Sequence, residues 1–70
     1  MTTCKVTREW SFRLQLSIIT KLVGSTVVVE QIDRQSSQAV VYFSSRDVDW
    51  VSFSELSKHT DFVLDKQSNL

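Results

Sequence analysis

Apolar and polar residues alternate without a break from Trp10 to Ile18. Successive side chains of a β-strand point to opposite faces, so this pattern predicts an amphipathic strand with one apolar face. Two of the residues that follow directly, Ile19 and Thr20, are β-branched like Ile18, and β-branched side chains favour strands over helices. We therefore expect this segment to be a strand.

A helix near residues 12–23 is the main alternative. Apolar residues also recur there at helical spacing, Ser11 could cap the first turn, and Gly24 could end the helix. A strand to about Leu16 followed by a helical turn to Leu22 is a further alternative.

The middle of the chain is expected to be mainly β. Gly24 is the only glycine in a chain without proline, and it predicts a tight turn because glycine adopts positive φ at little cost. The valine-rich segment Ser25–Ile32 predicts a second strand. The polar connector Asp33–Ser37 predicts a turn in which side chains bind their own backbone, and Gln38–Phe43 predicts a third strand.

A β-hairpin is expected across the turn Ser45–Asp47. Two registers are open there, because a slip of one residue exchanges the two faces. Pairing Phe43 with Trp50 would bury that tryptophan. Pairing Tyr42 with Trp50, which we prefer, leaves both of these rings on the outer face. The two faces are then Ala39, Val41, Val51 and Phe53 on one side, and Val40, Tyr42 and Trp50 on the other.

One turn of helix is predicted at about residues 53–58. Ser52 and Glu55 have the spacing of a capping box, in which each side chain binds the backbone amide of the other residue. Val51 and Leu56 stand where a hydrophobic staple would form. A short final strand is expected at 61–65.

The whole chain, residues 1–70, is expected to be a single small domain with frayed tails at 1–5 and 66–70. A chain of this length buries roughly 60–65% of its unfolded surface, so its stability margin is thin. Such domains often gain stability from a partner subunit.

The order of these segments resembles that of SH3-like small barrels. The resemblance is carried by residues 23–29, 39–43 and 50–56, the last of which resembles a strand followed by one helical turn ending in Glu-Leu. It covers about residues 23–65. The resemblance implies a mainly β fold, a barrel of about five strands with one helical turn.

A second resemblance is to the swapped-hairpin DNA-binding domains of the AbrB type. In that pattern residues 5–7 would open a strand, residues 17–22 would form a short helix, and residues 24–30 would form the next strand. The proline and the second glycine usual in that family are missing here.

Composition excludes several functional classes. Eight basic and eight acidic side chains give zero formal net charge, which argues against a strongly basic nucleic-acid binder. Cys4 is the only cysteine, so no disulfide can form within the chain, and a lone thiol fits a reducing compartment. Cys4 and His59 alone are too few to ligate zinc, and we expect neither a metal nor a cofactor.

No apolar run reaches the length of about 20 residues that a membrane span needs, and the first ten residues lack the apolar stretch of a signal peptide. We expect a cytoplasmic protein without a membrane partner.

Candidate catalytic chemistry is sparse. His59 stands two residues before Asp61 in a polar segment, and such a pair can orient a general base. A solvated loop histidine is the interpretation we favour, and we expect the protein not to be an enzyme.

The aromatic residues suggest a binding surface. If Tyr42 and Trp50 share the outer face, they form an exposed pair of the kind enriched in binding hot spots, with Arg46 and Asp49 at its rim. This predicts a non-enzymatic protein-interaction module: an accessory subunit or adaptor that binds a protein partner, or a self-associating domain that forms a homo-oligomer.

A small nucleic-acid-binding or transcription-regulatory domain is the alternative. Lys5, Arg8, Arg13 and Lys21 are interleaved with Trp10 near the beginning of the chain, and single strands are bound by stacking on aromatic rings beside cations.

Overall fold

The computed structural model describes residues 2–64 and shows a mainly β fold with one short helix. The elements are β1 (Thr2–Lys5), β2 (Trp10–Leu14), β3 (Ser17–Lys21), β4 (Thr26–Asp33), β5 (Gln38–Tyr42), β6 (Val48–Ser52) and α1 (Phe53–His59). The prediction of a mainly β fold with one helical turn is confirmed, and the strands at the centre of the chain lie close to their predicted bounds.

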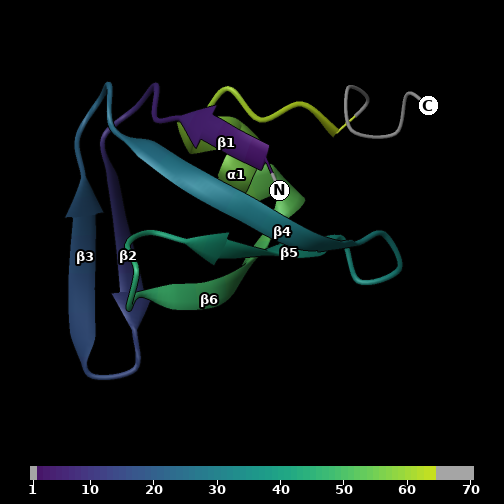
Figure 1. Ribbon diagram of the computed structural model, residues 1–70, viewed down its shortest axis with the longest axis horizontal. Coiled ribbons are helices and arrows are strands. Elements are labelled where there is room, and N and C mark those ends of the chain that lie inside the picture. Colours follow the sequence, from purple (N-terminus) through teal and green to yellow (C-terminus); the bar gives the residue numbers. More distant parts are fainter. Residues whose placement is uncertain (1, 65–70) are drawn as a thin grey trace.

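The strands form two antiparallel sheets instead of a closed barrel. β1, β4, β5 and β6 make one sheet in that order, and β2 and β3 make a separate hairpin. Figure 1 shows this hairpin standing at one end of the larger sheet, with its strands running across the direction of β4. Phe12 and Phe43 stack with ring centroids 4.9 Å apart, and the Lys21 Nζ donates to the Phe43 carbonyl at 2.9 Å, so side chains join the two sheets.

The alternating segment from Trp10 to Ile18 is a hairpin, so the prediction of one continuous strand was wrong, as was each alternative with a helix. Gln15 and Leu16 form a two-residue turn, in which Gln15 has a φ of 37°. The turn reverses which residues face inward. Even-numbered residues such as Phe12 face the core before the turn, and odd-numbered residues such as Ile19 face it afterwards. Leu16 and Ile18 therefore continue the apolar pattern on the exposed side, and the strand β3 replaces the short helix that the AbrB-type resemblance implied.

A β-bulge at Gln31 keeps β4 in contact with the core along its length. The pairing between β4 and β5 shifts by one residue between Glu30 and Asp33, and Gln31 has a φ of 49°. An extra residue in one strand of an antiparallel pair bends that strand and exchanges its faces. Ile32 consequently packs against the core, although simple alternation would put it on the side of Glu30.

Turns form here with little help from glycine. Gly24 has a φ of 96° and its amide donates to the Val6 carbonyl at 2.8 Å, which confirms the predicted turn. Asp33 Oδ1 accepts the amides of Gln35 and Ser36, as expected for a turn held by its own side chain. Ser37 then adopts a φ of 57°, an unusual conformation for a residue other than glycine.

The hairpin of β5 and β6 has the predicted faces but not the predicted register. Val40 pairs with Trp50 and Tyr42 pairs with Val48, so the strands are shifted by two residues from the preferred pairing of Tyr42 with Trp50. A shift of two preserves the faces. The connection is tightened because the Phe43 amide donates to the Asp47 carbonyl at 2.7 Å.

Helix α1 begins at its predicted cap. Ser52 Oγ accepts the Glu55 amide at 3.2 Å. The second bond of the expected capping box, from the Ser52 amide to the Glu55 carboxylate, does not form. The Glu55 carboxylate accepts the indole N–H of Trp10 instead. Val51 and Leu56, the predicted staple residues, are both buried in the core.

The segment after the helix lies against the end of β1, and the strand predicted at residues 61–65 does not form over residues 61–64. Thr60 makes an isolated bridge to Val6, and Asp61 exchanges hydrogen bonds with Lys5 through its amide and its Oδ1 atom. Residues 2–5, where we expected a frayed tail, form the strand β1. The expected tail at 66–70, like residue 65, lies outside the described residues.

The core lies between the inner face of the four-stranded sheet, the hairpin and α1. Its buried residues are Cys4, Val6, Trp10, Val27, Val29, Ala39, Val41, Phe43, Val51, Leu56 and Phe62. Within residues 2–64, no helix is long and apolar enough to cross a membrane.

Candidate functional site

The outer face of the four-stranded sheet holds the predicted aromatic pair. By strand alternation and register, its apolar residues are Val28, Val40, Tyr42, Val48 and Trp50. Trp50 is 43% exposed and Val48 is 39% exposed, although both are large apolar residues. Since Tyr42 pairs with Val48 and Val40 with Trp50, the two aromatic residues are diagonal neighbours, about 7–8 Å apart.

A groove on the outer face runs beside Tyr42. Its lining is mainly apolar and comes from the beginning of β4, the end of β5 and the loop that follows: Thr26, Val27, Val28, Glu30, Tyr42, Phe43, Ser44 and Ser45. Glu30 is the one charged side chain among these residues. The groove therefore suits an apolar group with a cation beside it.

Arg46 and Asp49 do not form the rim that we expected around the aromatic pair. Asp49 is adjacent to Trp50 in β6, so its side chain belongs to the opposite face, and its Oδ1 atom accepts the Trp50 amide at 2.7 Å. Both residues line a second, more polar hollow between residues 46–49, which end the loop and begin β6, and the tip of the β2–β3 hairpin at 14–17. The structure thus brings together Tyr42 and Trp50 only.

Sequence reasoning missed several outer-face residues. Val48 could have been found, because it stands two positions before Trp50 and must share its face. Val28 lies within three consecutive valines, in which no alternation marks the outward residue. The groove depends on how β4 and β5 are paired, which the sequence did not reveal.

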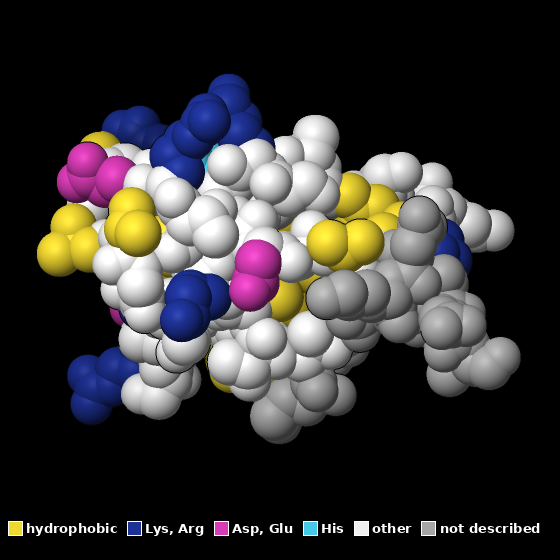
Figure 2. Space-filling model, turned by 90° about the horizontal axis from the view of Figure 1, so that it is seen from above, with side chains coloured by type: hydrophobic (Ala, Val, Ile, Leu, Met, Phe, Trp, Pro, Cys, Tyr) yellow, Lys and Arg dark blue, Asp and Glu magenta, His cyan; other side chains and the backbone are white. Residues whose placement is uncertain are grey.

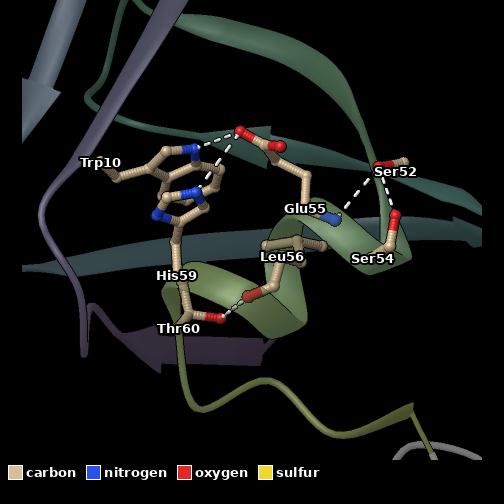
Figure 3. A network of polar contacts seen from close by, with 7 residues as sticks. All are labelled: Trp10, Ser52, Ser54, Glu55, Leu56, His59 and Thr60. Atoms are coloured by element: carbon tan, nitrogen blue, oxygen red, sulfur yellow. Dashed lines mark hydrogen bonds and ion pairs between the residues drawn. The ribbon is translucent and has the colours of Figure 1, made fainter.

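A second cluster joins Trp10, Glu55 and His59 (Figure 3). The Trp10 indole donates its Nε1 proton to Glu55 Oε2 at 2.8 Å, and the same oxygen lies 3.8 Å from His59 Nε2. The imidazole stacks on the indole with ring centroids 5.3 Å apart and an angle of 3° between the planes. The network therefore joins β2 of the hairpin to both ends of α1.

His59 is not the solvated loop histidine that we expected. It is the last residue of α1, its side chain is 15% exposed, and its Nδ1 atom is buried with no hydrogen-bond partner among residues 2–64. Its carboxylate neighbour is Glu55, one helical turn earlier, and not Asp61, which binds the Lys5 backbone. The contacts of His59 fix the position of Trp10, which is fully buried.

The residues proposed for nucleic-acid binding do not form a stacking platform. Trp10 is 0% exposed, so its ring cannot receive a base without unpacking the core. Lys5, Arg8 and Arg13 are exposed, whereas the Lys21 ammonium is bound to the Phe43 carbonyl. Figure 2 shows Lys and Arg side chains of one face in several separate places, mixed with acidic and apolar ones.

Cys4 is a core residue and not part of a flexible terminus. It is 3% exposed in β1, and this burial, with the Asp61 carboxylate as a smaller cause, raises the pKa of its thiol to about 11. A protonated thiol is a poor nucleophile at neutral pH. Among residues 2–64, no three His, Cys, Asp or Glu side chains are grouped so that they could hold a metal ion.

Comparisons of this chain with family models, with curated proteins and with solved structures found no match.

Proposed function

We propose that this protein is a non-enzymatic protein-interaction module whose binding surface is the outer face of the four-stranded sheet. The observation that carries the proposal is the exposure of Trp50, 43%, beside the exposed Val48 on β6. Tryptophan and tyrosine are enriched among the residues that dominate binding free energy, and both are present on this face.

The groove beside Tyr42 indicates the chemistry of the partner. Its mainly apolar lining would receive an apolar side chain, and Glu30 would pair with a lysine or arginine next to it. We therefore propose a protein partner that presents an apolar residue flanked by a basic one. The polar network of Trp10, Glu55 and His59 serves in this proposal to hold the hairpin against the sheet.

The test is a quantitative pull-down with the full chain as bait, comparing variants with the wild type and repeating each with nuclease. Trp50→Ser and Glu30→Lys alter the outer face, whereas Val63→Ser is a matched control at an apolar residue that is 45% exposed outside it. We expect at least one protein that the wild type and Val63→Ser retain equally and that both outer-face variants lose. Circular dichroism checks that every variant is folded.

A retained protein that does not distinguish Trp50→Ser from Val63→Ser would contradict the proposal. Retention that disappears with nuclease would support the nucleic-acid alternative instead. Mutating Lys5, Arg8 and Arg13 to Gln would then locate that surface. If these residues contact phosphates, retention by the wild type should also weaken steeply as the salt concentration rises.

A further inference from the structure

The outer edge of β3 is unpaired in the part of the chain that the structure describes. β3 pairs with β2 alone, and Figure 1 shows it at the margin of the molecule. An exposed strand edge offers backbone donors and acceptors to another strand. The edges of the larger sheet are partly covered: Asp61 binds the Lys5 backbone at the end of β1, and the Asp49 carboxylate binds the Trp50 amide of β6.

The side chains along this edge are strongly apolar and exposed. Leu16 is 101% exposed, Ile18 is 65% exposed and Leu22 is 62% exposed. By strand alternation these three residues and Thr20 point to the same side of the hairpin. Because the turn at Gln15 directs them away from the core, packing within this chain does not explain their apolar character.

The hairpin register decides which backbone groups face the free edge. Leu14 and Ser17 pair directly across the two-residue turn, and such a closing pair exchanges both hydrogen bonds. Pairs alternate from there, so the amides and carbonyls of Ile19 and Lys21 point to β2. Those of Ile18 and Thr20 point to the free edge.

We propose that two copies of this chain associate through their β3 edges. The strands run antiparallel about a two-fold axis at Ile19, which places Ile18 opposite Thr20 of the second copy. These residues exchange their outward hydrogen bonds, and the two hairpins become one four-stranded sheet. This surface is separate from the outer face that we propose for the other partner, so neither proposal depends on the other.

The edge is complementary to itself in this register. Leu16 falls opposite Leu22 of the second copy, so the most exposed leucine of each chain gains an apolar neighbour. Lys21 falls opposite Ser17 of the second copy, and no like charges meet. A slip of two residues in either direction keeps the hydrogen-bonding pattern but separates the leucines.

The first test is sedimentation equilibrium of the full chain over a wide concentration range. The register predicts opposite effects at Ser17, which is exposed. The Lys21 ammonium donates to the Phe43 carbonyl but keeps its positive charge, so Ser17→Glu should be attracted to Lys21 of the second copy and Ser17→Lys should be repelled by it. Two equivalent pairs change at once, so we expect the dissociation constant to fall about tenfold with Glu and to rise about tenfold with Lys. Trp50→Ser should leave the dimer unchanged.

The second test traps the register with disulfides. Ser17 and Lys21 of opposing strands are a non-hydrogen-bonded pair, in which side chains lie closest. A mixture of the single variants Ser17→Cys and Lys21→Cys should form a cross-linked dimer under mild oxidation, and each variant alone should not. Native Cys4 does not interfere because it is buried. A wild type that stays monomeric at millimolar concentration, or equal shifts for both Ser17 charge variants, would overturn the proposal.

Discussion

The buried indole of Trp10 has a single hydrogen-bond donor, and Glu55 supplies its acceptor at 2.8 Å. Leaving such a group unpaired costs about 1–3 kcal/mol. We predict that Glu55→Ala lowers the free energy of unfolding by that amount, measured by urea denaturation. Glu55→Gln keeps an acceptor oxygen and should cost less. Lys58→Ala, at an exposed residue of the same helix, is the control and should change stability by less than about 0.5 kcal/mol.

Cys4 predicts a specific response to alkaline pH. Its pKa is raised from an ordinary value of 9.0 to about 11 in the folded protein, chiefly by burial. The unfolded chain therefore loses the thiol proton first, and the contribution of the neutral thiol to stability is complete below pH 9 and lost as the pH rises toward 11.

The matched comparison is the wild type against Cys4→Ala, with unfolding free energies measured at intervals from pH 7 to pH 11. We predict that the difference between the two proteins is constant up to about pH 9 and then narrows. All other ionisable groups are the same in the two proteins, so their contributions to the difference cancel. A difference that stays constant to pH 11 would show that the thiol is not desolvated in the native state.

At the scale of elements, the bulge in β4 depends on one unusual backbone conformation. Gln31 has a φ of 49°, which β-branched residues adopt with difficulty. We predict that Gln31→Val lowers the free energy of unfolding by about 1–2 kcal/mol, although valine favours strands in general. Gln31→Gly should be neutral or stabilising, because glycine tolerates positive φ. If thermal melting shows that Gln31→Val is as stable as Gln31→Gly, the positive φ at this position does not strain a β-branched residue.

The sequence predicted those elements whose signal is local. Ser52 marked the start of α1, Gly24 marked a turn, and the alternation around Val41 and Val51 assigned the faces of β5 and β6 correctly. The placement of Tyr42 and Trp50 on one face followed from the same alternation. These features need only neighbouring residues, so they could be found without coordinates.

The hairpin of β2 and β3 could not be found in this way. Its turn uses Gln15 and Leu16, and neither residue is typical of a tight turn. The alternation of apolar and polar residues continues through the turn because Leu16 and Ile18 are apolar on the exposed side. The pattern is therefore the same as that of one long strand. The register of β5 and β6 was missed for a related reason, since the Phe43 amide and the Asp47 carbonyl close a loop that no sequence motif marks.

At the scale of the whole molecule, the two ends of the described chain stabilise each other. β1 adds an edge strand to β4, and the segment after α1 lies against the residues that follow β1 through the bridge between Val6 and Thr60. Phe62 is only 4% exposed in the core, and its amide donates to the Thr60 hydroxyl at 3.0 Å. Because the pairing of β1 with β4 and the bridge between Val6 and Thr60 join residues far apart in sequence, they form only when the rest of the fold is present.

Phe62 should therefore be important, because the free energy of unfolding of so small a domain is low. Replacing a buried phenylalanine with alanine costs about 3–5 kcal/mol, while a domain of this size has a total stability of about 4–10 kcal/mol. We predict that Phe62→Ala melts far below the wild type, as judged by circular dichroism, and that Val63→Ala, at the exposed neighbouring residue, melts close to the wild type. A cooperative Phe62→Ala protein with an unchanged melting temperature would show that the sheet, the hairpin and α1 fold without this closure.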